Sequence, residues 1–359
     1  MQDRLGLAIR VDAEPEIGLG HLRRCLTLGK QLEKDGFTVY ILTHGDIRSE
    51  LLQGFVNIPL SKADSPISEA YQDHELKDAE LTLRAIQDLS VKLVIVDSYR
   101  LGSIWEETVA MKGYKILAID DFRDRRHQAD ILLSDIDIPF QKELLSSKPN
   151  AYQLVGLKYA LIDSEFIATK LQKNYCQSAN QKKEILISYG GSDLTGETVK
   201  AILAIKMLVE KSSFWKNRIS VKVVVGPFNS RLEIIKHIVA GLSFIEILNA
   251  PNTLANLFSS ANILLIGGGN SMIEGVFMQK VCLVTATSPN QVLGVKYLHQ
   301  QSAILYLGHQ TEVNSEHICN TLLNTLNNYD EIVSQIRQLS LCDHLGASRV
   351  SHVIKSVLS

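Results

Sequence analysis

The sequence predicts an α/β fold made of two Rossmann-like domains. Its 359 residues are enough for two domains with separate cores. Short, nearly continuous apolar segments alternate with helical segments, a pattern typical of parallel β/α units covered on both faces. The alternation restarts after a polar stretch near 163–183, and each half begins with a strand and a glycine loop. We therefore expect two such domains that face each other across a cleft.

The first half contains five apolar segments with strand character. They lie at 5–9, 37–42, 93–96, 115–119 and 131–133. Apolar residues at helical spacing predict a helix that begins near Gly20 and further helices at 75–89 and 105–112. We expect residues 44–75, which are polar and contain Pro59 and Pro66, to be irregular.

The second half repeats this layout. Strands are expected at 184–188, 221–225, 244–248, 263–266, 281–284 and 303–307, with helices between them and over 316–357. The domain boundaries that follow are 1–163, a linker at 164–183, 184–340, and a C-terminal helix within 341–359.

Composition and charge limit the function classes. The net charge of −2 gives no reason to expect a nucleic-acid partner. No apolar run reaches the roughly 18 residues that a membrane span requires, and the N-terminus lacks a signal peptide pattern. The five cysteines show no metal-binding spacing. We expect a cytoplasmic, monomeric protein that uses no metal and no cofactor.

The stretch from Arg10 to Arg24 carries the first candidate site. Gly18 and Gly20 permit a tight turn and close approach of a ligand to the backbone. The helix that follows directs its free N–H groups at the loop, which suits a diphosphate. His21 lies on its first turn, where a neutral imidazole can accept a proton. A glycine turn with a histidine of no chemical role is the alternative.

Two loops of the second half are candidate phosphate sites. Gly190-Gly191-Ser192-Asp193 stands between a strand and a helix, although Ser192 or Asp193 could instead cap that helix. Three consecutive glycines, Gly267 to Gly269, precede Asn270, Ser271 and a helix that carries Glu274. A carboxylate there could bind both hydroxyls of a ribose. Asn290-Gln291 also follows a strand end.

The motifs, taken together, resemble those of the PseG family of UDP-sugar hydrolases in pseudaminic acid biosynthesis, related to SpsG-type proteins. The resemblance covers nearly the whole chain. The matching segments are Arg10-x-Asp12, Ile17-Gly-Leu-Gly-His-x-x-Arg24-Cys25, Asp97-x-Tyr99, Asp120-Asp121, Gly156-x-Lys158-Tyr159-Ala-Leu161, Gly190–Asp193, the loop from Gly268 to Glu274, and Asn290-Gln291. The later motifs are shared with GT-B glycosyltransferases of the MurG type.

The resemblance implies a GT-B fold and a metal-independent reaction. Water would release UDP from UDP-2,4-diacetamido-2,4,6-trideoxy-β-L-altrose with inversion at the anomeric carbon. His21 would be the general base. The implied substrate-binding residues are Arg10, Asp12, Gly18, Gly20, Arg24, Tyr99, Asn290 and Gln291. The implied nucleotide-binding residues are Gly190, Gly191, Ser192, Asp193, Gly268, Gly269, Asn270, Ser271 and Glu274.

Two other classes of function stay open at this stage. The chain could be a GT-B glycosyltransferase that uses a UDP-amino sugar, for which UDP release requires an acceptor. It could also be a non-catalytic protein that binds nucleotide sugars without turning them over. An NAD-dependent enzyme is disfavoured because the glycine fingerprint is incomplete.

Overall fold

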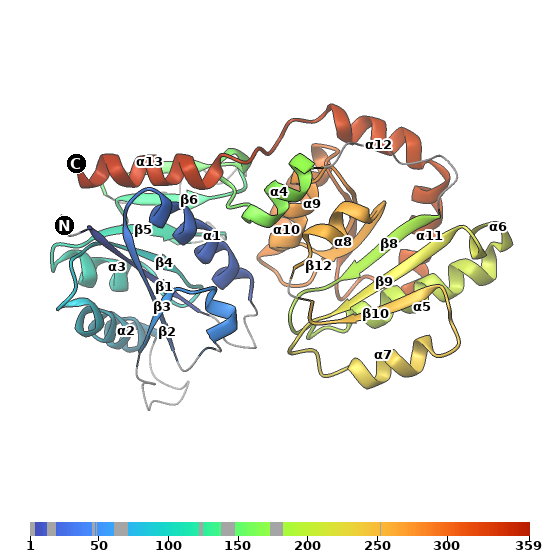
Figure 1. Ribbon diagram of the computed structural model, residues 1–359, viewed down its shortest axis with the longest axis horizontal. Coiled ribbons are helices and arrows are strands. Elements are labelled where there is room, and N and C mark those ends of the chain that lie inside the picture. The colour runs from blue at the N-terminus through green and yellow to red at the C-terminus, as the bar shows by residue number, and fades with distance from the viewer. Residues whose placement is uncertain are drawn as a thin grey trace. The chain divides into compact units, whose positions relative to one another are not determined.

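The computed structural model describes residues 4–12, 19–44, 47, 49–60, 71–121, 125–137, 148–172, 182–251 and 253–359. The chain forms two compact units (Figure 1). The first unit comprises residues 1–161 and 344–359, and the second comprises residues 162–343. The expected two-domain α/β organisation is therefore present, and each unit is described separately below.

The first unit is built on a parallel sheet with the strand order β3-β2-β1-β4-β5-β6-β7. Its strands are β1 (Gly6–Val11), β2 (Thr38–His44), β3 (Val56–Leu60), β4 (Val91–Asp97), β5 (Lys115–Ile119), β6 (Ile131–Ser134) and β7 (Tyr152–Val155). The chain starts in the middle of the sheet, builds outward to β3 and then returns to add β4 beside β1. This order is that of a doubly wound nucleotide-binding fold.

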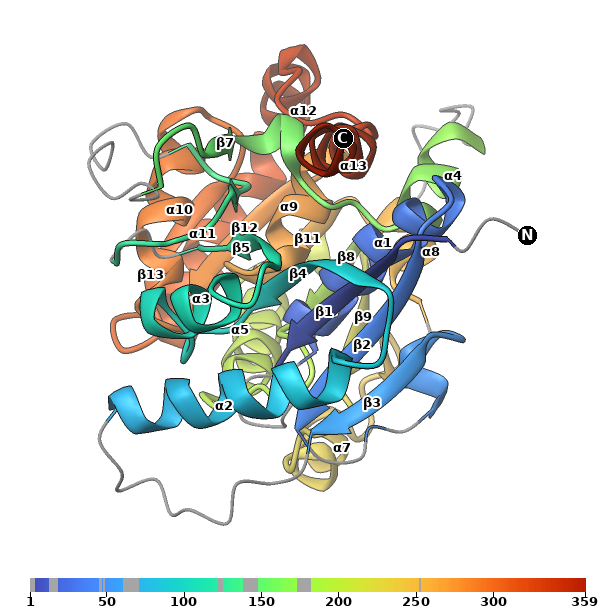
Figure 2. The ribbon, with the colours of Figure 1, turned by 90° about the vertical axis from the view of Figure 1, so that its left-hand side faces the viewer.

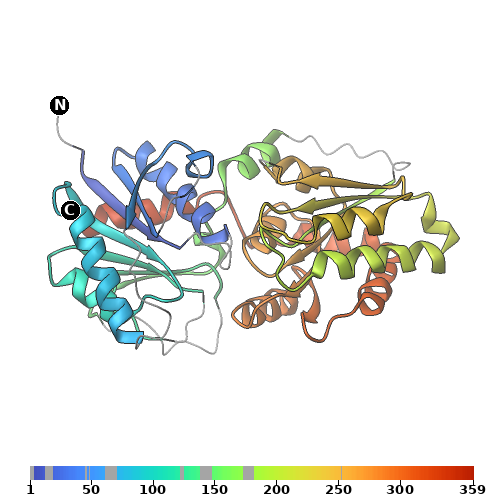
Figure 3. The same cartoon turned by 90° about the horizontal axis from the view of Figure 1, so that it is seen from below.

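Helices cover both faces of the first sheet. They are α1 (Gly20–Lys34), η1 (Ser49–Leu52), α2 (Tyr71–Ile86), α3 (Ser103–Ala110), η2 (Leu157–Tyr159) and α13 (Gly346–Leu358). The helices α2 and α3 pack together on one face, and α1 packs with α13 on the other (Figures 2 and 3). Trp105 of α3 is fully buried against Val94 and Ala118 of the sheet. Successive strand residues point to opposite sides of the sheet, so strands that are apolar throughout make both faces apolar.

Two strands of the first sheet were not expected from the sequence, and both lie at its edges. The segment 44–75, expected to be irregular, contains β3, and β7 follows β6 at the other edge. Pro59 lies within β3. Proline cannot donate a ladder hydrogen bond, so it argues against a central strand but is tolerated at an edge. The four residues of β7 are too few to show a periodic pattern.

The second unit repeats the doubly wound order in a parallel sheet, β10-β9-β8-β11-β12-β13. Its strands are β8 (Lys183–Ser188), β9 (Ile219–Val225), β10 (Ile245–Asn249), β11 (Ile263–Gly267), β12 (Val281–Ala286) and β13 (Leu305–His309). Its helices are α4 (Ser164–Gln172), α5 (Glu197–Lys211), α6 (Ser213–Lys216), α7 (Leu232–Val239), α8 (Ala255–Ser260), α9 (Asn270–Phe277), α10 (Gln291–Gln300), α11 (Ser315–Asn327) and α12 (Tyr329–Gln338).

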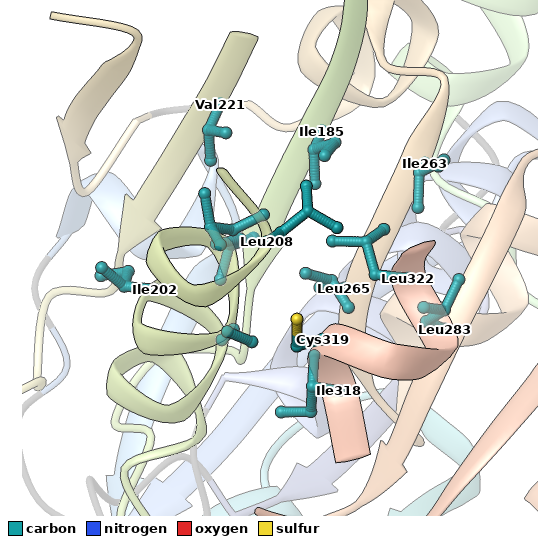
Figure 4. Close-up of a cluster of buried hydrophobic side chains, with 14 of the residues drawn as sticks. Ile185, Ile202, Leu208, Val221, Ile263, Leu265, Leu283, Ile318, Cys319 and Leu322 are labelled. Carbon is teal, nitrogen blue, oxygen red and sulfur yellow. The ribbon is translucent and has the colours of Figure 1, made fainter. Parts of the chain in front are cut away.

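Close packing of helices on both faces forms the core of the second unit. On one face, α5 and α11 contribute Leu208 and Leu322 to a buried cluster with Leu265 of β11 (Figure 4). On the other face, α9 approaches the sheet at Gly275. A Cβ there would come within 2.5 Å of Cys282 Sγ, so only glycine permits this contact. The loops at the ends of these strands therefore begin from closely packed elements.

The segment expected to be a linker, 164–183, begins with α4, and the second unit starts at Ile162. Residues 173–181 of that segment lie outside the described residues. The expected C-terminal helix is α13, and it belongs to the first unit rather than to the second. Among the described residues, no helix is long and apolar enough to cross a membrane.

Candidate active site

The polar residues of the first unit meet where its strand order reverses. The strands β1 and β4 are neighbours in the sheet, although residues 12–90 separate them in the chain. The carboxyl ends of such neighbouring strands form the usual ligand-binding edge of this fold. Asp97 is the last residue of β4, and His21 is the second residue of the helix that follows β1. The topology therefore brings these two residues together.

His21 is held by a buried carboxylate. Its Nδ1 atom lies 2.5 Å from Asp97 Oδ1, and the ring of Tyr99 packs edge-on against it with centroids 4.4 Å apart. Although burial opposes ionisation, Arg24 and His21 hold the pKa of Asp97 far below its usual range. An ionised carboxylate only accepts hydrogen bonds, so Nδ1 is assigned as the donor. This tautomer leaves Nε2 as the basic nitrogen of His21.

Arg24 joins the two carboxylates at the strand ends. Its Nε and Nη2 atoms donate to Asp97 at 2.6 Å each, and its Nη1 atom donates to Asp121 Oδ1 at 2.6 Å. Burial opposes the charge, but Asp121 and Asp97 keep the pKa of Arg24 well above its ordinary value. Arg24 is only 6 % exposed. Its guanidinium thus holds Asp97 and Asp121 in place, and the substrate contact that the resemblance implies for Arg24 stays a prediction.

Asp121 also positions Tyr99. The Tyr99 hydroxyl donates to Asp121 Oδ2 at 3.1 Å. Burial and the negative charge of Asp121 raise the pKa of Tyr99 well above its ordinary value, so the phenol stays protonated. His21, Asp97, Arg24, Tyr99 and Asp121 therefore form one connected group at the ends of β4 and β5.

Arg10 and Asp12 belong to a second, fully buried network. Arg10 is 0 % exposed and donates from Nε and Nη2 to Asp78 of α2. Its Nη1 atom is 3.0 Å from Asp12, which also accepts a 2.6 Å hydrogen bond from Ser98 Oγ. Arg10 therefore has no exposed surface for the expected substrate contact. The network instead fixes the loop that carries Tyr99.

The glycine turn before α1 is described only in part. Gly20 is the first residue of α1, whereas Gly18 lies outside the described residues. The expected role of Gly18 stays a prediction.

In the second unit, the loop at 190–193 ends in a helix cap. Asp193 accepts hydrogen bonds from the backbone N–H groups of Glu197 (2.8 Å) and Thr198 (3.0 Å) at the start of α5. The sequence left open whether Asp193 caps the helix or binds phosphate, and the hydrogen bonds of the cap occupy its carboxylate. Gly190 has a φ of +82°, which favours glycine. A Cβ at Gly226 would collide with the carbonyl oxygens of Gly190 and Gly191, so this loop packs backbone to backbone against its neighbour.

The loop at 268–271 is shaped by Gln291. The Gln291 Oε1 atom accepts hydrogen bonds from the N–H groups of Gly268 (3.2 Å) and Thr287 (2.9 Å), which ties the ends of β11 and β12 together. A Cβ at Gly268 would lie 2.5 Å from Val295 Cγ2. Gln291 therefore positions the loop through its side-chain oxygen.

This loop leads directly into a helix. Asn270 and Ser271 open α9, and Gly269 stands at its N-cap position with no side-chain cap. Glu274 lies one turn later and is half-buried. Asn290 accepts a 2.5 Å hydrogen bond from Ser288 Oγ at the start of α10. The backbone N–H groups of the first turn of α9 are the kind of donors that bind phosphate.

Asp97 and Asp121 lie just after expected strands and belong to the motifs of the resemblance, but they are not among the expected site residues. Their position after a buried strand is the sequence feature that indicates a site residue in this fold. Their partners, however, lie 73 and 97 residues away at Arg24.

Comparisons with known proteins support the fold. No family model matches the chain. A UDP-2,4-diacetamido-2,4,6-trideoxy-beta-L-altropyranose hydrolase of Campylobacter jejuni is 24 % identical over 284 residues, which cover 75 % of this chain and 87 % of that protein. An uncharacterized protein of Methanocaldococcus jannaschii is 22 % identical over 284 residues, which cover 76 % of this chain. The match spans about half, 54 %, of that archaeal protein.

Solved structures with the same architecture cover nearly the whole chain. MurG of Acinetobacter baumannii has a TM-score of 0.66 at 16 % identity and covers 98 % of this chain and 99 % of its own. MnaA of S. aureus in complex with UDP has a TM-score of 0.68 at 14 % identity and covers 99 % and 97 %. At such identities the likeness concerns the fold alone. The chain has an α/β fold of the GT-B type with two Rossmann-like units, as expected.

Proposed function

We propose that this protein is an enzyme that hydrolyses UDP-2,4-diacetamido-2,4,6-trideoxy-β-L-altrose, or a closely related UDP-diacetamido sugar, in nonulosonic acid synthesis. The observation that carries the proposal is the contact between His21 Nδ1 and ionised Asp97, which directs a basic Nε2 atom away from the carboxylate. The similarity to the Campylobacter jejuni hydrolase supports the choice of substrate.

In the proposed reaction, His21 Nε2 removes a proton from water as the water oxygen attacks the anomeric carbon. The bond between that carbon and the diphosphate oxygen breaks, and UDP leaves with the electron pair. Because UDP is a stable anion, the leaving group needs little acid catalysis, whereas water needs a base. Attack opposite the leaving group inverts the anomeric centre. Asp97 stabilises the imidazolium that forms, as a buried carboxylate does in hydrolytic triads.

The second unit is proposed to bind UDP. The N-terminus of α9, with Gly268, Gly269, Asn270 and Ser271, offers backbone donors to the diphosphate, and Glu274 is proposed to bind the ribose hydroxyls. Gly190, Gly191 and Ser192 offer a second such loop, whose shape the Asp193 cap maintains. These donors would stabilise the departing charge, so no metal ion or cofactor enters the proposal.

The test is turnover of the nucleotide sugar by wild type and by His21→Asn. Wild type is expected to release UDP and free sugar without an acceptor, and proton NMR should show the inverted anomer first. Loss of the general base should slow turnover by about 10²- to 10⁴-fold while UDP binding stays unchanged. A fully active His21→Asn enzyme would show that the base is another group.

Solved structures with the same fold include glycosyltransferases and UDP-N-acetylglucosamine 2-epimerases, so the same assay must separate these classes. A glycosyltransferase would release UDP only after an acceptor is added. An epimerase would leave the sugar attached to UDP. A non-catalytic binding protein would bind UDP but would not turn over any UDP-sugar.

A further inference from the structure

A third carboxyl group stands beside the proposed catalytic group. Ile119 of β5 and Leu133 of β6 are paired in register. Asp121 lies two residues after Ile119, and Asp135 lies two residues after Leu133. Asp97 ends the next strand, β4. Three adjacent strands thus carry Asp97, Asp121 and Asp135 at or just beyond their carboxyl ends.

The three carboxylates differ in what their oxygens contact. Both oxygens of Asp97 accept from Arg24, and the two oxygens of Asp121 accept from Arg24 and Tyr99. Among the described residues, the carboxyl group of Asp135 has no hydrogen bond from another residue, and it is only partly exposed. Such a carboxyl group loses part of its hydration without gaining a hydrogen bond from another side chain, which is unfavourable.

The surroundings of Asp135 increase that cost. Burial and the charges of Asp121 and Asp97, which outweigh the opposing charge of Arg24, raise the pKa of Asp135 to about 6. At pH 7.5 the group is mostly ionised and lies beside two other carboxylates. A ligand group that donates a hydrogen bond would relieve this unfavourable arrangement. The N–H and O–H groups of a glycosyl unit are such donors.

We propose that Asp135 binds the glycosyl group of the substrate by accepting a hydrogen bond from an acetamido N–H or a hydroxyl, and so contributes to sugar specificity. This inference rests on the proposed function, because it assumes that a nucleotide sugar occupies the site at His21. Asp135 is independent of the UDP contacts, which are proposed for the second unit.

The experiment measures binding in a His21→Asn background, where turnover does not interfere. Calorimetry is run with the UDP-diacetamido sugar and with UDP alone on this enzyme and after adding Asp135→Asn. One charge-assisted hydrogen bond corresponds to about 10- to 100-fold in affinity. We expect Asp135→Asn to weaken binding of the nucleotide sugar by that factor and to leave UDP binding unchanged. Asp137→Asn, an exposed change on the same loop, is the matched control.

A proton count separates direct contact from a structural effect. A hydrogen bond donated to Asp135 stabilises its ionised form, so binding at pH 6 should release up to about half a proton. Titrations in buffers of different ionisation enthalpy measure this release, and Asp135→Asn should remove it. Unfolding midpoints of all variants show whether the fold is intact.

The outcomes distinguish the two proposals. Equal affinity for the nucleotide sugar with and without Asp135→Asn overturns the inference and leaves the hydrolase proposal standing. Asp135-dependent binding in a wild-type protein that releases no UDP supports the inference and refutes hydrolysis. If the nucleotide sugar does not bind at all, both proposals are overturned.

Discussion

The change Asp97→Asn tests the proposed tautomer of His21. In the wild type, Arg24 donates twice to Asp97 and His21 Nδ1 donates once. The amide that replaces the carboxylate offers one oxygen and an NH₂ group that cannot accept. Because Arg24 has only donors, the amide oxygen should turn to Arg24 and the NH₂ group to His21. Nδ1 then accepts, and the proton moves to Nε2, which can no longer act as a base.

The size of the effect follows from these contacts. Loss of the base should slow turnover by about 10²- to 10⁴-fold. Breaking a buried ion pair costs about 3–5 kcal/mol, and the lower end applies because Arg24 retains its hydrogen bond to Asp121. UDP binding should stay within a factor of about two of wild type, since the proposed UDP contacts do not involve this carboxylate.

The assay is UDP release per folded molecule, with denaturant unfolding to measure stability. Asp130→Asn is the control, because it makes the same change at the opposite end of the sheet, where Asp130 pairs with Lys115 and Lys148. Turnover of Asp97→Asn within tenfold of wild type would refute the assigned tautomer and with it the role of Asp97.

Two further predictions concern stability. Although burial opposes the charge, hydrogen bonds to Asp120 and Glu106 raise the pKa of His127 to about 9. Because this pKa is higher in the folded than in the unfolded chain, where it is near 6.5, protonation of His127 stabilises the fold. The contribution is complete when the pH is below about 6.5 and disappears as the pH rises through 9. We therefore compare the unfolding free energies of wild type and His127→Gln at two pH values. The advantage of wild type should be about 3 kcal/mol larger at pH 6 than at pH 10. An equal advantage at both pH values would contradict a charged His127. In the second unit, Gly268→Ala should cost about 1–3 kcal/mol because its Cβ would lie 2.5 Å from Val295 Cγ2, whereas Gly269→Ala, whose nearest contact is Gln291 at 3.8 Å, should change stability little. Equal unfolding midpoints for the two alanine variants would show that the loop yields at Gly268.

Central elements of the fold could be predicted from sequence because their signals are local. The strand β5 was expected at 115–119, where the structure places it, since a buried parallel strand is a continuous apolar run between polar ends. The edge strand β3 carries Pro59 and lies mostly at the surface, so its pattern resembles a loop.

The site was harder to predict because its contacts are long-range. From sequence, Arg24 is a cation on a helix that starts at a glycine turn, which suggests a ligand contact. Only the pairing of β1 with β4 shows that the guanidinium of Arg24 binds the carboxylate of Asp97. Asp135 follows a strand of four residues, and its proximity to Asp121 depends on the register of β5 and β6. The cap formed by Asp193 was among the alternatives considered, since a capping residue and a phosphate-binding residue occupy the same position in sequence.

The return of α13 to the first unit has a consequence for synthesis on the ribosome. Val350 and Ile354 are buried, Ser351 donates to Asp35 at the end of α1, and Gly346 packs against the Ala160 carbonyl so closely that any side chain would collide. Residues 344–359 emerge only after the entire second unit, 162–343, has been translated. At about 5–20 residues per second, the first unit remains without its last helix for roughly 10–40 seconds. The second unit, although later in sequence, is therefore the first to have all of its residues available for folding.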